Sequence, residues 1–150
     1  MKGTLYGVGI GPGDPELLTL KAVRLIRENG VIALPGEDPK ETVAYKISVQ
    51  AVPELADKTL LALAMPMTKD KKILKENYDR AAERVAEILD QGKNVVFLTL
   101  GDPTVYSTYM YVHQRLETKG YPVAIVSGIT SFCAVAARMN MSLVERSEPL

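Results

Sequence analysis

Two loops of the sequence carry residues from which a small-molecule site could be built. The first is the glycine-rich segment 7–15, GVGIGPGDP, and the second is the Gly-Asp-Pro at 101–103. The first loop does not fit a dinucleotide fingerprint, because Pro12 or Asp14 stands where G-x-G-x-x-G needs its third glycine, and no Gly-Lys-Ser/Thr completes a Walker loop. Asp14 and Glu16 would also place negative charge where a pyrophosphate should lie. These features argue against a phosphate ligand.

Acidic loops instead favour a ligand that is cationic or rich in hydroxyl groups. An S-adenosyl group has this chemistry, since it carries a sulfonium, an α-ammonium and ribose hydroxyls but no phosphate. The simpler explanation of any single Gly-Asp-Pro is a turn with no further role. The chain has two such tripeptides, at 13–15 and 101–103, and this repetition favours a ligand site.

The elements that must position these loops follow from the pattern of apolar residues. Short apolar runs alternate with amphipathic segments, which is typical of an α/β domain with a mostly parallel five-stranded sheet and helices on both faces. In such a sheet, ligands bind at the carboxyl ends of the strands, where both loops lie. The predicted strands are 3–10, 31–35, 59–65, 94–100 and 122–128, and the predicted helices are 19–29, 41–52, 69–91 and 104–120.

Composition limits the partners and the metal chemistry. Lysine plus arginine and aspartate plus glutamate each number 18, so no net charge recruits nucleic acid, and no apolar run reaches the length of a membrane span. Cys133 and His113 are the single residues of their kinds, which excludes a disulfide framework and argues against a protein-bound metal. We expect a cytoplasmic protein in which Cys133 is a small buried hydrophobe and not a nucleophile.

Three longer motifs together resemble the tetrapyrrole (corrin/porphyrin) methylase family, whose members transfer methyl groups from S-adenosylmethionine. The motifs are GVGIGPGDPELLTLKA at 7–22, LTLGDPTVYSTYMYV at 98–112 and VSGITSFCAVAA at 126–137, and the similarity runs through nearly all 150 residues. Within the family, MPMTKD at 65–70 and GDPTVYST at 101–108 resemble the C20-methyltransferases of cobalamin (vitamin B12) synthesis. Uroporphyrinogen methylases usually show Phe and Gly-Arg after this Gly-Asp-Pro.

The resemblance implies half of a binding site for the methyl donor. In it Gly101 would allow close backbone approach, Asp102 would accept hydrogen bonds from the amino acid or ribose end, and Thr130 would offer a hydroxyl at a helix start. No residue is assigned as catalytic, because a sulfonium is already activated and the protein has only to align the reactants and exclude water. The implied donor contacts are Pro12, Leu100, Gly101, Asp102, Val105, Tyr106, Thr130 and Ser131.

The resemblance also implies a tetrapyrrole substrate, precorrin-2 or its cobalt-containing counterpart, cobalt-factor II. Its carboxylates would need basic partners, for which Lys69, Arg138 and Arg146 are candidates by location alone, a solvated surface role being the more usual one. One or two of the tyrosines within 106–111 could stack on the macrocycle. Family members have a second domain, so we expect residues 1–150 to be the N-terminal domain of a homodimeric enzyme, inactive without the C-terminal domain.

Other functions stay open from the sequence. The chain could belong to another tetrapyrrole-methylase-like enzyme, such as a uroporphyrinogen or other precorrin methylase or a protein-modifying diphthine synthase. An ordinary nucleotide-binding α/β domain is the other class, which the acidic loops and the missing third glycine disfavour. Substrates with and without cobalt are equally compatible with the residues.

Overall fold

The five strands pair side by side in one parallel sheet. In the computed structural model, which describes residues 1–146, the strands run in the order β3-β2-β4-β1-β5. All pairs in this sheet are parallel, so the predicted α/β class and sheet are confirmed. The strands are β1 (Leu5–Gly9), β2 (Val31–Pro35), β3 (Thr59–Leu63), β4 (Val95–Thr99) and β5 (Val123–Val126).

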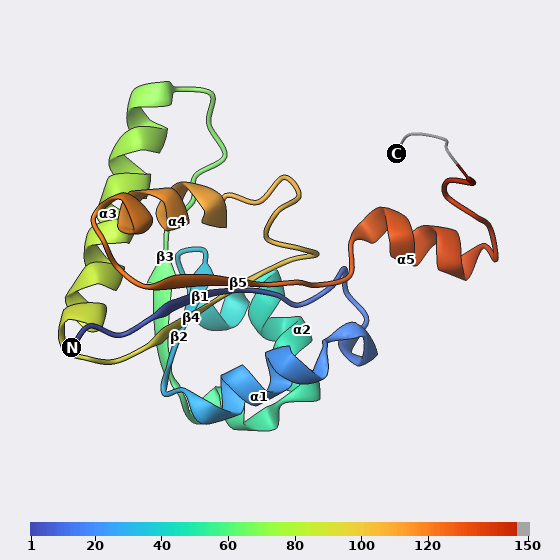
Figure 1. The fold of residues 1–150 in the computed structure, drawn as a ribbon, viewed down its shortest axis with the longest axis horizontal. Helices are drawn as coiled ribbons and strands as arrows, with labels where there is room; N and C mark the ends of the chain where they lie inside the picture. The colour runs from blue at the N-terminus through green and yellow to red at the C-terminus, as the bar shows by residue number, and fades with distance from the viewer. Residues whose placement is uncertain (147–150) are drawn as a thin grey trace.

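Helices cover both faces of the sheet (Figure 1). One face packs against α1 (Leu20–Glu28) and α2 (Val43–Ala51), and the other against α3 (Lys71–Asp90) and α4 (Tyr109–Thr118). The fifth helix, α5 (Ser131–Arg138), projects beyond the carboxyl edge of the sheet (Figure 1). The connections contain three short 3₁₀ helices, Pro15–Leu17, Pro39–Glu41 and Pro53–Asp57.

The central strand β4 shows why the sheet is buried on both sides. All five of its residues are buried, and successive side chains point to opposite faces. Val96 and Leu98 join the core beneath α1 and α2, whereas Val95 and Phe97 join the core beneath α3 and α4. Such continuous burial explains why the strand is an uninterrupted apolar run and not an alternating one.

The helix predicted at 104–120 begins five residues later than expected, at Tyr109. The Thr104 N–H donates to Asp102 Oδ2 at 2.9 Å, a local turn that competes with helical hydrogen bonding. Tyr106 then adopts a left-handed backbone conformation with φ 52°, which a helix cannot contain. The segment before Tyr109 is therefore a loop at the carboxyl end of β4.

Helix α5 also differs from expectation. Thr130 caps it as predicted, since its hydroxyl accepts from the Cys133 N–H at 3.4 Å. However, none of its residues is buried, and Cys133 is exposed where a buried hydrophobe was expected. The reason is that α5 lies beyond the sheet (Figure 1), so residues 1–146 leave all its side chains half-buried or exposed.

Two further features of the fold are the segment after α5 and the length and polarity of the helices. Residues 142–146 form no helix or strand, in line with the sequence, and residues 147–150 lie outside the described part of the chain. Within residues 1–146, every helix is too short or too polar to cross a membrane.

Candidate functional site

The loops that follow β1 and β4 meet at the carboxyl edge of the sheet. The two strands are parallel neighbours, with Gly9 opposite Thr99. Just beyond them, the Gly101 N–H donates to the Gly11 carbonyl at 2.8 Å, and the Gly11 N–H donates back to the Gly101 carbonyl at 3.3 Å. The prediction that the topology brings both loops to one edge is confirmed.

Glycine is required where these loops touch the one that follows β5. A Cβ at Gly9 or at Gly128 would fall inside contact distance of the Gly101 carbonyl oxygen, and each would also collide with the backbone of the other glycine. Backbone atoms cannot move aside as a flexible side chain can. The three loops can therefore pack this closely only without side chains at these positions.

The carboxylate of Asp102 ties the three loops together. Its Oδ1 accepts from the Ser127 hydroxyl at 2.7 Å and from the Gly128 N–H at 2.8 Å, both on the loop after β5. Its Oδ2 accepts from the N–H and the hydroxyl of Thr104. Burial alone would raise the pKa of Asp102, but the hydrogen bonds from Thr104, Gly128 and Ser127 outweigh it and lower the pKa to about 2.

This arrangement changes the role expected for Asp102. Four protein donors occupy its carboxylate oxygens, so the side chain holds the loops in place and has little capacity left to accept from a ligand. Its charge nevertheless remains, because the donors are neutral and no salt bridge within residues 1–146 involves Asp102. A buried, unneutralised carboxylate favours a cation in the space next to it.

A hollow of about 420 Å³ opens beside Asp102, between the β4 loop and the start of α5. All eight residues implied as donor contacts lie in its wall, together with Phe132, which the sequence analysis missed. The only signal for Phe132 was its position directly after Ser131. The lining residues are Pro12, Leu100, Gly101, Asp102, Val105, Tyr106, Thr130, Ser131 and Phe132.

Several other candidates lie outside this wall. Asp14 is exposed, and its carboxylate accepts from the Glu16 N–H at 2.9 Å, so it serves as an ordinary turn residue. The basic residues considered for substrate carboxylates, Lys69, Arg138 and Arg146, do not line the hollow either. Of the two acidic turns, only the one at Asp102 contributes to the site.

The chemistry of the wall fits a ligand with hydroxyl groups and a positive charge. Gly101 has φ +62°, and a Cβ there would meet nothing closer than 3.8 Å, so its backbone is open to close approach from the hollow. Thr130 and Ser131 add hydroxyls, and the first turn of α5 has N–H groups without helical partners. None of the nine lining residues is lysine or arginine, the side chains that usually bind phosphate.

The described residues form no cluster of potential metal ligands. Within residues 1–146 there is no group of three or more histidine, cysteine, aspartate or glutamate side chains positioned to hold a metal ion.

Comparison with known proteins gives a consistent family likeness. The family model described as Tetrapyrrole (Corrin/Porphyrin) Methylases matches residues 4–150. The chain is 41% identical over 148 residues to a probable cobalt-precorrin-2 C(20)-methyltransferase of Methanocaldococcus jannaschii, covering 97% of the chain and 61% of that protein. It is 33% identical over 157 residues to the precorrin-2 C(20)-methyltransferase of Sinorhizobium sp, covering 99% and 62%. The chain thus spans about three fifths of the length of these two relatives.

The fold resembles a structure solved with a ligand. The uroporphyrin-III C-methyl transferase of Thermus thermophilus, complexed with S-adenyl homocysteine, superposes with a TM-score of 0.66 at 29% identity. The match covers 97% of this chain and 55% of that one.

Proposed function

The chain belongs to the tetrapyrrole (corrin/porphyrin) methylase family, and on this premise we propose that its protein methylates C20 of precorrin-2 or of cobalt-factor II in cobalamin biosynthesis, with S-adenosylmethionine as the methyl donor. Two similar relatives are named as C(20)-methyltransferases of precorrin-2 or cobalt-precorrin-2. The loop sequence with Tyr106 and Ser107, in place of the residues usual in uroporphyrinogen methylases, supports the same substrate.

The hollow beside Asp102 is the observation that carries this proposal. Loops from three strands converge there, and its wall combines open backbone at Gly101, hydroxyls at Thr130 and Ser131, and a buried negative charge. A sulfonium ligand with ribose hydroxyls matches this set, whereas a dinucleotide would bring phosphate next to the Asp102 carboxylate. The alternative of a nucleotide-binding domain is disfavoured for the same reason.

The protein residues would act by binding and orientation. The donor, when bound, supplies a methyl group on a positively charged sulfur. Asp102 would lower the electrostatic energy of that charge from within the wall, Gly101 would let the backbone approach the donor, and the apolar side chains of Val105 and Phe132 would exclude water. Replacement of hydrogen by methyl at C20 also releases a proton from the acceptor carbon, and no observation assigns its removal to any of these residues, so we name no catalytic base.

We further propose that residues 1–150 are the N-terminal domain of a two-domain enzyme that works as a homodimer in the cytoplasm. The additional length of the relatives supports the second domain, since the chain covers 61% and 62% of theirs. A second domain would complete the wall around the donor and supply basic residues for substrate carboxylates. The enzyme would hold no metal of its own, so any cobalt would arrive with the substrate.

A uroporphyrinogen methylase is the second candidate, favoured by the likeness to the Thermus thermophilus structure. One experiment separates the two. The full-length protein is incubated with isotope-labelled S-adenosylmethionine and with precorrin-2, cobalt-factor II or uroporphyrinogen III in turn, and the products are analysed by mass spectrometry. We expect the gain of one methyl group on one of the first two. Methylation of uroporphyrinogen III alone would establish the second candidate instead.

A further inference from the structure

The last residue of β4 is the only polar residue of that strand. Thr99 follows the apolar run Val95–Leu98, and it is only 8% exposed. Its side chain lies on the same face of the sheet as Phe97, because alternate residues of a strand point the same way, and this face is covered by α3 and α4. A buried hydroxyl needs a hydrogen-bond partner. The Ser107 hydroxyl provides one, with 2.9 Å between the two oxygens.

This hydrogen bond between Thr99 and Ser107, which we call the clasp, closes the loop after β4 at its base. Thr99 is a firm anchor, because it pairs with Gly9 in the sheet and its carbonyl accepts from the Ile10 N–H at 3.0 Å. The clasp therefore ties one wall of the hollow beside Asp102 to the sheet. Five of the nine lining residues lie between the two partners of the clasp, namely Leu100, Gly101, Asp102, Val105 and Tyr106.

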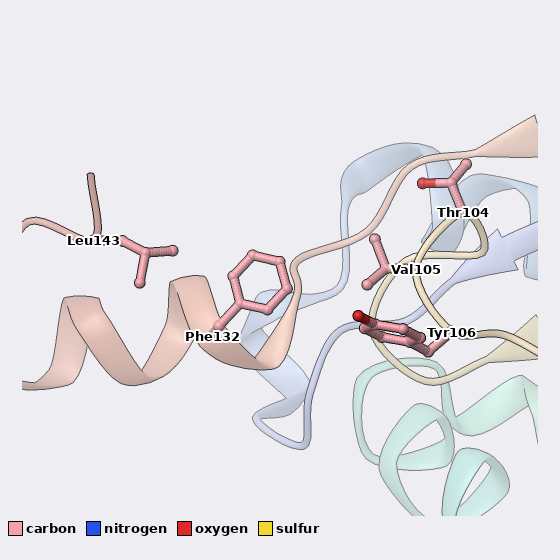
Figure 2. A pocket seen from close by; sticks show the side chains of 5 residues that line it. All are labelled: Thr104, Val105, Tyr106, Phe132 and Leu143. Carbon is pink, nitrogen blue, oxygen red and sulfur yellow. The ribbon is translucent and has the colours of Figure 1, made fainter. Parts of the chain in front are cut away.

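The second half of this loop has fewer contacts than the first. Asp102 fixes the first half through its hydrogen bonds with Thr104 and with the loop after β5. Tyr106 has a left-handed backbone, with φ 52°, which is unfavourable for a tyrosine, and its side chain is 102% exposed. Figure 2 shows the side chains of Val105 and Tyr106 extending from the loop toward Phe132 on α5. The conformation at Tyr106 is thus held by the backbone anchors on either side of it and not by packing of its ring.

Ser107 is the anchor on the far side of Tyr106, and it has two roles. Its hydroxyl accepts from the Tyr109 N–H at 3.2 Å, and its carbonyl accepts from the Met110 N–H at 3.4 Å, so it caps the first turn of α4. Thr108, which directly precedes the helix, makes no capping hydrogen bond with its side chain. The Thr99 hydroxyl takes part in the clasp but not in the cap. Substitutions at the two positions can therefore separate the two roles.

We propose that Thr99 and Ser107 are positioning residues for the methyl donor, because their clasp holds Val105 and Tyr106 in the conformation that forms the wall of the donor site. This inference rests on the proposed function, which assigns the hollow beside Asp102 to the donor. The free energies of one hydrogen bond and of one left-handed residue are similar in size, so loss of the clasp allows the loop to leave this conformation for part of the time. A ligand that requires a partly populated conformation binds more weakly in proportion to that population.

The test measures binding of S-adenosylhomocysteine to the full-length protein by calorimetry. Thr99→Val keeps the shape of the side chain and removes the clasp, whereas Ser107→Ala removes both the clasp and the cap. We expect each variant to weaken binding by about three- to tenfold, and the double variant to bind no more weakly than the weaker single variant. Thr99→Ser keeps a hydroxyl, so it should bind within about twofold of the wild type.

Two controls separate donor positioning from stability. Thr108→Ala removes an exposed hydroxyl next to Ser107, and it should change binding by less than about twofold. Ser107→Ala should lower the thermal midpoint more than Thr99→Val does, because it also removes the cap of α4. A purely structural role predicts that affinity follows the thermal midpoint. The clasp instead predicts similar losses of affinity in two variants whose thermal midpoints differ.

A third substitution tests whether the clasp acts through the left-handed backbone at Tyr106. Asparagine adopts this conformation more readily than tyrosine, so Tyr106→Asn relieves the strain that the clasp opposes. Comparison is made within that background, so that loss of the ring affects both proteins equally. We expect Thr99→Val to weaken S-adenosylhomocysteine binding by less than about twofold when Tyr106→Asn is already present.

Each contrary result has a distinct meaning. If Thr99→Val binds S-adenosylhomocysteine as well as the wild type does, or if only Ser107→Ala loses affinity, the clasp does not position the donor, while the proposed function stands. Equal weakening by Thr99→Val with and without Tyr106→Asn would also overturn the inference, because the clasp would not act through the left-handed loop. If the wild type does not bind S-adenosylhomocysteine, the proposed function and the inference both fail.

Discussion

Replacing Asp102 with asparagine tests whether an ionised carboxylate holds the three loops of the site together. Asparagine has nearly the same shape but only one side-chain oxygen, so its amide group must face either Thr104 or the pair Ser127 and Gly128. In either orientation, an amide N–H points at a backbone N–H that now donates to the carboxylate. Two donors then oppose each other at a position that is only 6% exposed.

The pKa of Asp102 sets the magnitude of the effect. Its value of about 2, against 3.8 for an ordinary aspartate, means that ionised Asp102 stabilises the folded chain by about 2 kcal/mol at neutral pH. Because the pKa is lowered on folding, this contribution is complete above about pH 5 and is lost as the pH falls toward 2. For Asp102→Asn, the loss of charged hydrogen bonds and the unpaired N–H should together lower the free energy of unfolding by a similar amount, about 2 to 4 kcal/mol at pH 7.

The assay is urea denaturation of wild type and variant at several pH values between 3 and 7, with the free energy of unfolding extracted at each. The control is Asp38→Asn, which changes another Asp-Pro turn where the exposed carboxylate accepts from the Lys40 N–H at 3.2 Å. The free energy of unfolding of the control should fall by less than about 0.5 kcal/mol. For Asp102→Asn, the deficit should shrink as the pH falls below 5. A deficit that is the same at pH 3 and pH 7 would refute the role given to ionisation.

Two further predictions concern the framework of the site. Gly128→Ala should lower the free energy of unfolding by about 3 kcal/mol in urea denaturation, because its Cβ would collide with the backbone of Gly101 and Gly9; a loss below about 0.5 kcal/mol would show that the loops do not pack this closely. Tyr109→Phe should cost about 1 kcal/mol, since it leaves the buried Nδ1 of His113 without its partner, and an unchanged thermal midpoint would contradict this hydrogen bond.

The order of the elements was predictable because it depends on local patterns. The strand 31–35 was predicted with the bounds that the structure shows, and Thr19 caps α1 as expected, accepting from the Ala22 N–H at 3.0 Å. Parallel pairing followed from the alternation of strands and helices. Eight of the nine residues that line the hollow beside Asp102, in contrast, came from resemblance to a family, since spacing alone left Asp102-Pro103 explicable as a simple turn.

Tertiary structure decided what the side chains do. Asp102 bonds to Ser127 and Gly128, which lie 25 and 26 residues further along the chain, so no local pattern could show that its carboxylate is already satisfied. The left-handed backbone of Tyr106 lies in the loop that Asp102 anchors, and it is why α4 starts late. The sequence by itself determined which elements form, because apolar periodicity acts over a few residues. Only the folded chain determined which polar groups remain free for a ligand, because that depends on contacts between loops distant in sequence.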